Sequence, residues 1–412
     1  MSRYAVLSRR ALLALSTVLL ASLPLHAQAQ AKDVKIGVLL PLTGRYAEAG
    51  TGSLRGLQLI VNETNAAGGI KALGGAKIEL ALADDAADTE KTVTGARRLI
   101  NDEKVSFIIG PYSTPEAEAF MPVADRFQVG GVGLQTTIIP RTPYYSMISI
   151  PAANFGKGYA DLIGWLRGKG AKIDSVVITY PNNDYGQLVS KSAASILTAG
   201  GIKVTDSIAA DPHVKDMTPI VLKVKSLAPD AVISVVYFQD GVLLHKARFN
   251  LGYTSPIWLG GSAGFTDDKL WNVLGDEVAE KTLTRSFGLA FFSPDAALPG
   301  LQSLLERAHK AYPGKVIDQS FVMGAQAGIF LVHALENAKS TDPKAVNAAF
   351  RALKFPAKSP AIVAPFITGD FSFSADGVTQ GSSPLFVQWK AGKKAIVYPE
   401  SVATAAPVLP AR

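Results

Sequence analysis

The chain has 412 residues, of which 48% are apolar and 18% charged, and its 41 basic and 34 acidic side chains give a formal net charge of +7. It contains no cysteine, which excludes disulfides, thiolate metal sites and a lipidated amino-terminal cysteine. The excess of basic residues is small and dispersed, so the composition argues against nucleic acid or an anionic surface as a partner.

Residues 1–31 have the features of a cleaved export signal. Three arginines precede a short apolar run (11–23), and small residues follow it, which predicts cleavage after Ala29 or Ala31. Two adjacent arginines in the basic region leave both the general secretory and the twin-arginine routes open. No later stretch is long and apolar enough to span a bilayer. We therefore expect a soluble protein exported to a Gram-negative periplasm.

The next part of the chain alternates between short β-rich runs and helical patterns. The expected strands are 34–40, 78–82, 105–109 and 129–134, with helical spacing of apolar residues at 54–66, 89–102 and 115–127. The alternation then begins again, with strands at 176–180, 204–208, 231–236 and 257–259 and helices at 155–168, 186–199, 214–227 and 240–250. This repetition predicts an α/β fold of two lobes, each with a parallel sheet covered by helices on both faces.

The last third of the chain departs from this rhythm. A strand is expected at 282–290, helices at 301–311, 320–338 and 343–353, and strands at 371–373, 385–389 and 395–398, with a hairpin turn at Ala391-Gly392. Such a segment can add to both lobes, so the chain would cross between them more than once, as in a hinge. We expect lobe 1 to comprise 32–150 plus 290–365 and lobe 2 to comprise 151–289 plus 366–400. Residues 401–412 are expected to form a flexible tail.

Motifs for catalysis and cofactors are scarce, so we expect no metal, no cofactor and no enzyme activity. The mature chain has four histidines, at 213, 245, 309 and 333, and none is paired at metal-ligand spacing. One pattern, Gly260-Gly261-Ser262-Ala263-Gly264, fits the nucleophile elbow of serine hydrolases. Its partner would be His309 or His333. His333 follows an apolar run within a helical pattern and is expected to pack in the core, and His309 is expected on a solvated helix face between Arg307 and Lys310. A secreted serine hydrolase that uses Ser262 remains an alternative.

The loops that follow the predicted strands hold the candidate binding residues. Ligands of open parallel sheets bind at the carboxyl ends of the strands, and free N–H groups at a helix start hold anions there. Four such loops carry hydroxyl groups or aromatic rings. They contribute Tyr112, Ser113 and Thr114, then Thr136 and Thr137, then Tyr185, and then Tyr237.

Several segments, in this order and spacing, resemble the type I periplasmic binding proteins of the branched-chain amino acid (Leu/Ile/Val-binding) group. The resemblance covers about residues 33–400. Its marks are Ile36-Gly37-Val38, Pro41-Leu42-Thr43-Gly44, Asn65-Ala66-Ala67-Gly68-Gly69-Ile70, Asp84-Asp85, Phe107-Ile108-Ile109-Gly110-Pro111, Asp184-Tyr185-Gly186 and Pro229-Asp230-Ala231-Val232. It implies two Rossmann-like lobes joined by three crossing strands, expected near 149–153, 286–291 and 364–369. It also implies a monomeric receptor that delivers a small-molecule ligand to the permease subunits of an ABC importer.

The resemblance also implies roles for the candidate residues. Ser113, Thr114, Thr136 and Thr137 would meet a ligand carboxylate, and Tyr185 and Tyr237 would cover the ligand. Where amino acid binders place an acid for the ammonium group, this chain has Gly261 and Ser262 after Gly260. Asp240, Asp267 or Asp268 could substitute for that acid. The ligand stays open among amino acids, amides and organic or aromatic acids, and a ligand sensor of the same fold remains a second alternative.

Overall fold

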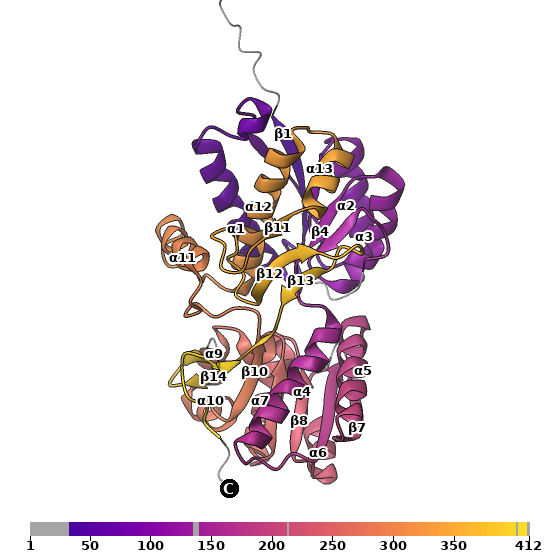
Figure 1. Cartoon of the computed structure of the whole chain (residues 1–412). Helices are drawn as coiled ribbons and strands as arrows, with labels where there is room; N and C mark the ends of the chain where they lie inside the picture. The colour runs from indigo at the N-terminus through magenta and orange to yellow at the C-terminus, as the bar shows by residue number, and fades with distance from the viewer. Residues whose placement is uncertain (1–32, 135–139, 212–213, 401–402, 410–412) are drawn as a thin grey trace, which may run out of the picture.

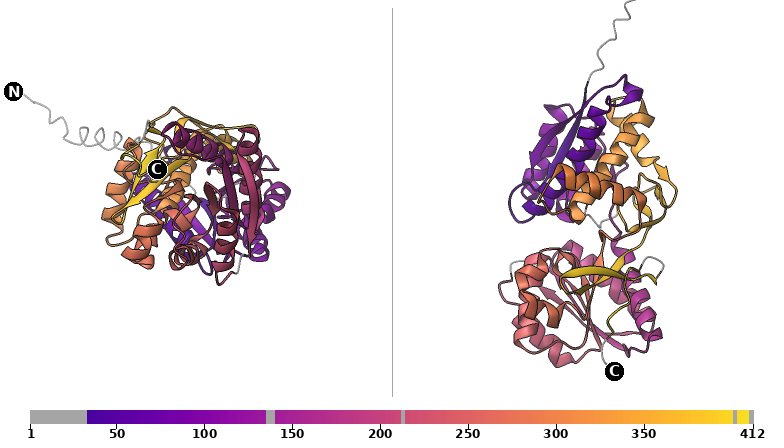
Figure 2. Two further views of the ribbon diagram at one scale, coloured as in Figure 1. Left: turned by 90° about the horizontal axis from the view of Figure 1, so that it is seen from below. Right: turned by 90° about the vertical axis from the view of Figure 1, so that its left-hand side faces the viewer.

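The computed structural model describes residues 33–134, 140–211, 214–400 and 403–409. These residues form two α/β lobes, one above the other in Figure 1 and in the right-hand view of Figure 2. The predicted two-lobed α/β fold is therefore confirmed. The predicted export signal lies outside the described residues. No helix within the described residues has the length and apolar character needed to cross a membrane.

Lobe 1 is built on a five-stranded parallel sheet of order β2-β1-β3-β4-β5. Its strands are β1 (Val34–Leu40), β2 (Ile78–Asp84), β3 (Ile108–Ile109), β4 (Gly131–Gly133) and β5 (Tyr145–Met147). Helices α1 (Ala47–Ala66) and α12 (Gln319–Ala338) pack on one face, and α2 (Thr89–Asn101) and α3 (Thr114–Phe127) on the other. Because both faces of the sheet are covered, β3, β4 and β5 are buried along their whole length and β1 is buried at every residue except Lys35.

Further elements complete lobe 1. Helix α11 (Pro299–Ala311) lies against α1, where Arg307 forms an ion pair with Glu63, and α13 (Pro343–Arg351) packs on α12. A separate antiparallel sheet joins β11 (Lys354–Phe355), β12 (Ile367–Phe373) and β13 (Thr379–Ser382). A short 3-10 helix, η1 (Lys71–Leu73), lies near α12.

Lobe 2 has a seven-stranded sheet of order β15-β14-β10-β9-β8-β6-β7. The parallel part holds β6 (Ser175–Pro181), β7 (Lys203–Ala210), β8 (Ala231–Val235), β9 (Ile257–Gly261) and β10 (Ser286–Ala290), and β14 (Leu385–Lys390) and β15 (Lys393–Tyr398) add an antiparallel edge. Helices α4 (Ala152–Gly168) and α5 (Asp184–Ala199) cover one face, and α6 (Thr218–Leu227) and α7 (Phe238–Asn250) the other. Three short helices follow β9: α8 (Ala263–Thr266), α9 (Leu270–Leu274) and α10 (Asp276–Thr282).

The chain crosses between the lobes three times, but one crossing differs from the expectation. The first lies between β5 and α4 and the second follows β10. The third lies between β13 and β14, at residues 383–384, and not near 364–369. The reason is that β12 and β13 pair with each other and with β11, while Val378 bridges Met147 at the edge of the lobe 1 sheet. The expected start of lobe 2 at residue 366 was therefore wrong, and the chain rejoins the lobe 2 sheet at Leu385.

Two smaller expectations are also corrected. The expected strand 282–290 begins only at Ser286, because α10 extends to Thr282. Residues 403–409, expected as part of a flexible tail, are held against the β14–β15 hairpin. Gln388 donates to the carbonyl oxygen of Val408 at 3.0 Å and accepts from its N–H at 2.7 Å.

Helices α1 and α12 approach closely because glycines lie at their contact. A Cβ atom on Gly324 would lie 1.9 Å from the carbonyl oxygen of Ser53, and one on Gly56 would lie 1.9 Å from that of Phe321. Asp318 caps α12 by accepting a hydrogen bond from the Phe321 N–H at 3.0 Å. The close helix contact thus fixes the start of α12, and with it Asp318, at the end of lobe 1 that faces lobe 2.

Candidate functional site

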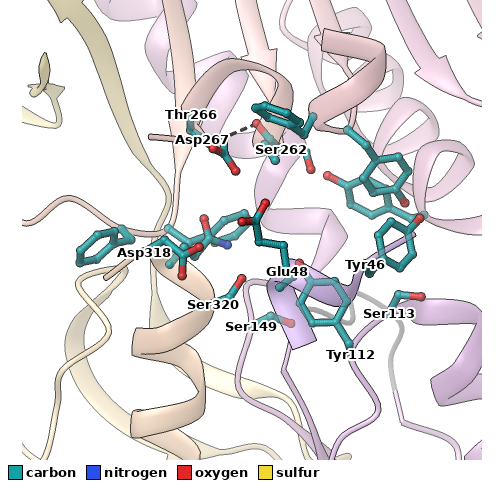
Figure 3. Close-up of a pocket in the computed structure, with 18 of the residues that line it drawn as sticks. Tyr46, Glu48, Tyr112, Ser113, Ser149, Ser262, Thr266, Asp267, Asp318 and Ser320 are labelled. Atoms are coloured by element: carbon teal, nitrogen blue, oxygen red, sulfur yellow. Dashed lines mark hydrogen bonds between the residues drawn. The ribbon is translucent and has the colours of Figure 1, made fainter. Parts of the chain in front are cut away.

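A cavity of about 250 Å³ lies between the two lobes and is lined by side chains from both of them (Figure 3). Much of its lining comes from the segments that follow β1, β3, β6, β8 and β9, at the carboxyl ends of these parallel strands, as expected for open parallel sheets. The lobe 1 side includes Arg45, Tyr46, Glu48, Tyr112, Ser113, Thr114, Asp318 and Ser320, and the lobe 2 side includes Phe155, Tyr185, Tyr237, Ser262, Asp267, Asp268 and Lys394. Ser149, Phe291 and Phe292 line it from the first two crossings.

The loop after β3 forms part of the lobe 1 wall. Tyr112 forms a side-chain hydrogen bond with Ser320 at the start of α12, and burial raises the pKa of the Tyr112 phenol, so this side chain stays neutral. Ser113 precedes α3, and its hydroxyl donates to the carboxylate of Glu116. In this conformation the Ser113 proton is therefore committed to Glu116, and a ligand carboxylate would have to compete for it. Thr114 lines the cavity at the first residue of α3.

Tyrosines form much of the lobe 2 wall. The side chain of Asn183 caps α5 by accepting from the Gly186 N–H at 2.9 Å, and it donates to the Tyr237 hydroxyl at 3.3 Å. The rings of Tyr185 and Tyr237 lie 5.9 Å apart. Burial raises the pKa of both phenols, and Tyr185 also hydrogen-bonds to the side chain of Ser262. The pair therefore presents neutral rings and hydroxyl groups to the cavity.

Ser262 stands in an unusual backbone conformation between β9 and α8, with φ of 68° and ψ of −173°. Such conformations cost energy for a residue with a side chain and gather at functional sites. Here the hydroxyl of Ser262 meets Tyr185 rather than an imidazole. His245 directs one ring nitrogen to the Gly264 carbonyl at 3.0 Å and the other to Arg248 at 3.3 Å, and His333 packs on Phe355 in lobe 1.

The lobes touch each other directly beside the cavity. Arg45 of lobe 1 lies 3.6 Å from the carboxylate of Asp240 in lobe 2, with its guanidinium carbon 5.3 Å from the centre of the Tyr237 ring. Tyr46 hydrogen-bonds to Tyr237 through the side chains, and their rings lie 5.6 Å apart. These contacts hold the two lobes in a closed arrangement.

The opposite end of the cavity is rich in carboxylates. Figure 3 shows Glu48, Asp267 and Asp318 pointing into the same space. Glu48 pairs with Lys269 across the lobes, and Asp268 pairs with Lys394 at 2.8 Å. Burial raises the pKa of Asp267, and the charge of Asp318 raises it further. Burial likewise raises the pKa of Asp318. Among the described residues, no group of three or more histidine or acidic side chains is arranged to hold a metal ion.

Aromatic side chains close the cavity on the side of the crossings. The ring of Phe155 lies 5.4 Å from that of Phe291, which in turn lies 5.8 Å from that of Phe366. The cavity is thus apolar along this side and charged at the end near Asp267 and Asp318.

Most of the residues chosen from the sequence lie together in this cavity. Tyr112, Ser113, Thr114, Tyr185, Tyr237 and Ser262 line it, whereas Thr136 and Thr137 lie outside the described residues. Gly261 is absent from the lining. A Cβ atom there would lie 2.6 Å from the Tyr159 hydroxyl, so Gly261 faces the packed side of β9.

Sequence reasoning missed several lining residues, among them Arg45, Glu48, Phe155, Phe291, Asp318 and Lys394. Arg45 follows a strand end, as the chosen loops do, and Asp318 precedes an apolar helix as a cap. Those two signals were available in the sequence. Lys394 lies on the β14–β15 hairpin, and only the fold brings it to the cavity.

Comparisons with known proteins agree on one family. Residues 33–394 match the sequence profile of a family described as periplasmic binding protein. "Leu/Ile/Val-binding protein homolog 7" of Brucella abortus (strain 2308) is 28% identical over 401 residues, which cover 93% of this chain and 96% of that protein.

Two solved structures show the same fold. A branched-chain amino acid transporter substrate binding protein from Streptococcus pneumoniae, in complex with isoleucine, has a TM-score of 0.75 and 21% identity, with 89% of this chain and 100% of that chain covered. An ABC transporter solute binding protein from R. palustris, in complex with benzoate, has a TM-score of 0.73 and 21% identity, with 92% of this chain and 98% of that chain covered.

Proposed function

This chain belongs to the periplasmic binding protein family, and we propose that it is the solute receptor of an ABC importer. In this role it is exported to the periplasm, closes on one small ligand and presents the closed form to the permease. The observation that carries the proposal is the cavity between two lobes that touch each other on both sides of it, through Arg45 and Asp240 and through Glu48 and Lys269. A ligand that contacts both lobes favours closure, so binding changes the shape that a permease recognises.

The cavity supports a small ligand with at least one polar end. Its volume of about 250 Å³ is near the lower end of the range for small-molecule sites, so the cavity is too small for a peptide. Tyr112, Ser149 and Ser320 place hydroxyl groups beside rings that would cover an apolar ligand body. The relatives differ in what they hold, since one structure contains isoleucine and another benzoate. An amino acid, an amide and an organic or aromatic acid therefore remain within the proposed class.

A serine hydrolase is less well supported by the geometry at Ser262. The strained backbone at this residue resembles that of a nucleophile elbow, but its hydroxyl bonds to a tyrosine with a raised pKa, which is a poor general base. Labelling of wild-type protein, but not of Ser262→Ala, by a fluorophosphonate probe would support hydrolysis and reject the receptor as the sole function.

The receptor function is tested by a thermal-shift screen of amino acids, amides, ureas, amines and aromatic acids. We expect at least one solute to raise the melting temperature and to bind with a stoichiometry of one in titration calorimetry. The protein should release that solute chemically unchanged. Small-angle scattering of the free and loaded protein then reports closure of the lobes. A screen in which no solute binds would reject the proposal.

A further inference from the structure

Asp267 and Asp318 face the same end of the cavity from opposite lobes. Asp318 caps α12 in lobe 1, and Asp267 follows α8 in lobe 2. Figure 3 shows both carboxylates directed into the cavity. They come from segments about fifty residues apart in sequence and on different lobes, so only closure brings them together.

These two carboxylates are not neutralised by the protein in the way that their neighbours are. Four carboxylates and two cationic side chains line the cavity, which leaves an excess of negative charge there. Asp268 and Glu48 form ion pairs with Lys394 and Lys269. Within the described part of the chain, the hydrogen bond found for each of the other two comes from backbone N–H: Lys269 to Asp267 at 2.9 Å, and Phe321 to Asp318 at 3.0 Å.

Burial makes this arrangement costly without a counter-charge. Each carboxylate loses hydration in the closed form, and the charge of Asp318 opposes ionisation of Asp267. Other cations are nearby, since Arg55 and Lys269 act on Asp318 and Lys394 acts on Asp267. Among the described residues, none of these cations comes within ion-pair distance of either carboxylate. A positively charged group between the two lobes would offset both the burial of the two carboxylates and the repulsion between them.

The other acids that could bind an ammonium group already form ion pairs within the protein. Of the three acids that the sequence offered as partners for an ammonium group, Asp240 pairs with Arg45 at 3.6 Å and Asp268 pairs with Lys394 at 2.8 Å. Asp267 is the one whose carboxylate stays turned to the cavity without an ion pair among the described residues.

We propose that Asp267 and Asp318 together bind a cationic group of the ligand, so that the transported solute is an organic cation or carries an ammonium or amidinium group at this end. The inference rests on the proposed receptor function and specifies its substrate class. The apolar body of the solute would lie along Phe155 and Phe291, and the cation would join the two lobes by bridging their carboxylates.

The test uses pairs of probes that differ by one ammonium group: L-leucine and 4-methylpentanoate, L-lysine and L-norleucine, and benzylamine and benzyl alcohol. Affinities are measured by calorimetry for the wild type, Asp267→Asn and Asp318→Asn. Asparagine keeps the oxygen that accepts the backbone N–H, so the hydrogen bond from Lys269 to residue 267 and the cap at residue 318 both survive. Asp102→Asn, at an exposed position after α2, is the matched control for the loss of one acid, and melting curves confirm that every variant folds.

We expect the ammonium-bearing member of at least one pair to bind roughly ten- to a hundredfold more tightly, as for charge-assisted hydrogen bonds. Each cavity variant should remove most of that advantage without weakening the binding of the member that lacks the additional ammonium group, and Asp102→Asn should change neither affinity. Equal affinities within every pair, or an ammonium preference that survives both substitutions, would overturn the inference and leave the receptor function intact. The inference is also overturned, and the receptor function again left intact, if an anion or a neutral solute from the wider screen binds and none of the six probes does. Failure of the whole screen rejects the receptor function itself.

Discussion

Arg45 of lobe 1 reaches across the cleft to within 3.6 Å of the Asp240 carboxylate in lobe 2, and its guanidinium lies over the Tyr237 ring. The Asp240 side chain is only 10% exposed, whereas that of Arg45 is 37% exposed, so the pair lies at the rim of the cavity. Since it can exist only when the lobes are together, it adds stability to the closed form alone. The contact between Arg45 and Asp240 therefore shifts the equilibrium between open and closed lobes toward the closed form.

We predict that Arg45→Ala weakens ligand binding by about three- to thirtyfold. At partly exposed sites the lost ion pair contributes about 0.2–1 kcal/mol and the lost cation–π contact about 0.5–1 kcal/mol. Calorimetry on the single variants Arg45→Ala and Asp240→Asn and on the double variant measures the coupling between them. A coupling energy near zero would show that the two residues are neighbours without a shared role in closure.

A second prediction concerns Tyr185, whose side chain is 8% exposed and lines the cavity. Tyr185→Ala should weaken binding by about 1–3 kcal/mol, the range for an aromatic anchor. It should also lower the stability of the free protein, because the ring packs against Phe155, with the two ring centres 6.3 Å apart, and the hydroxyl hydrogen-bonds to Ser262. Tyr185→Phe keeps the ring and should retain most of the affinity. If both variants bind as the wild type does, the ring serves the core alone.

Much of this architecture could be predicted because it depends on local pattern. The strand β1 and the helices α2, α3 and α12 follow from apolar runs and helical spacing that the sequence carries in one place. The third crossing could not be predicted in the same way. The residues of strand β12, ITGDFSF, do not indicate which lobe the strand joins, and its pairing with β11 and β13 leaves no periodic pattern in the sequence.

The candidate site likewise contains residues that could be predicted from local pattern and residues that could not. Tyr185 and Tyr237 were found because each lies within four residues of the end of a recognisable strand. Asp318 and Lys394 were missed because a capping aspartate and a hairpin lysine are common features of surfaces. What distinguishes them is closure, which places them at a buried cavity opposite residues of the other lobe.

A third prediction uses the close contact of α1 with α12. Gly324→Ala should destabilise the protein by about 1–3 kcal/mol, the cost of overpacking a filled contact, because its Cβ would lie 1.9 Å from the Ser53 carbonyl oxygen. Gly164→Ala on α4 is the matched control, since a Cβ there meets nothing within 4 Å and alanine should stabilise the helix by about 0.5–1 kcal/mol. Urea unfolding of both variants measures the contrast. Equal effects of the two substitutions would mean that α12 shifts easily and does not fix Asp318.

The last prediction concerns Asp85, a fully buried acid in lobe 1 that lies outside the cavity lining. One carboxylate oxygen accepts from the Ala87 N–H at 2.9 Å, and the other has no hydrogen-bond partner among the described residues. Burial raises the pKa of Asp85 to about 7, and the carboxylates of Glu116, Asp84 and Asp88 act in the same direction. The folded state therefore binds this proton more tightly than the unfolded chain, in which the pKa is about 3.9.

The sign of the pH dependence follows from that difference. The stabilising effect of the bound proton is fully present below about pH 4 and is lost as the pH rises through about 7. Asp85→Asn cannot ionise and keeps the oxygen that accepts from Ala87. We expect it to be more stable than the wild type at pH 8, by up to about 4 kcal/mol for a shift of about three pKa units. The advantage should shrink to near zero toward pH 4. Urea unfolding at pH 4.5, 6 and 8 measures it, and a variant that is less stable than the wild type at pH 8 would show that the ionised carboxylate has a stabilising partner in the folded protein.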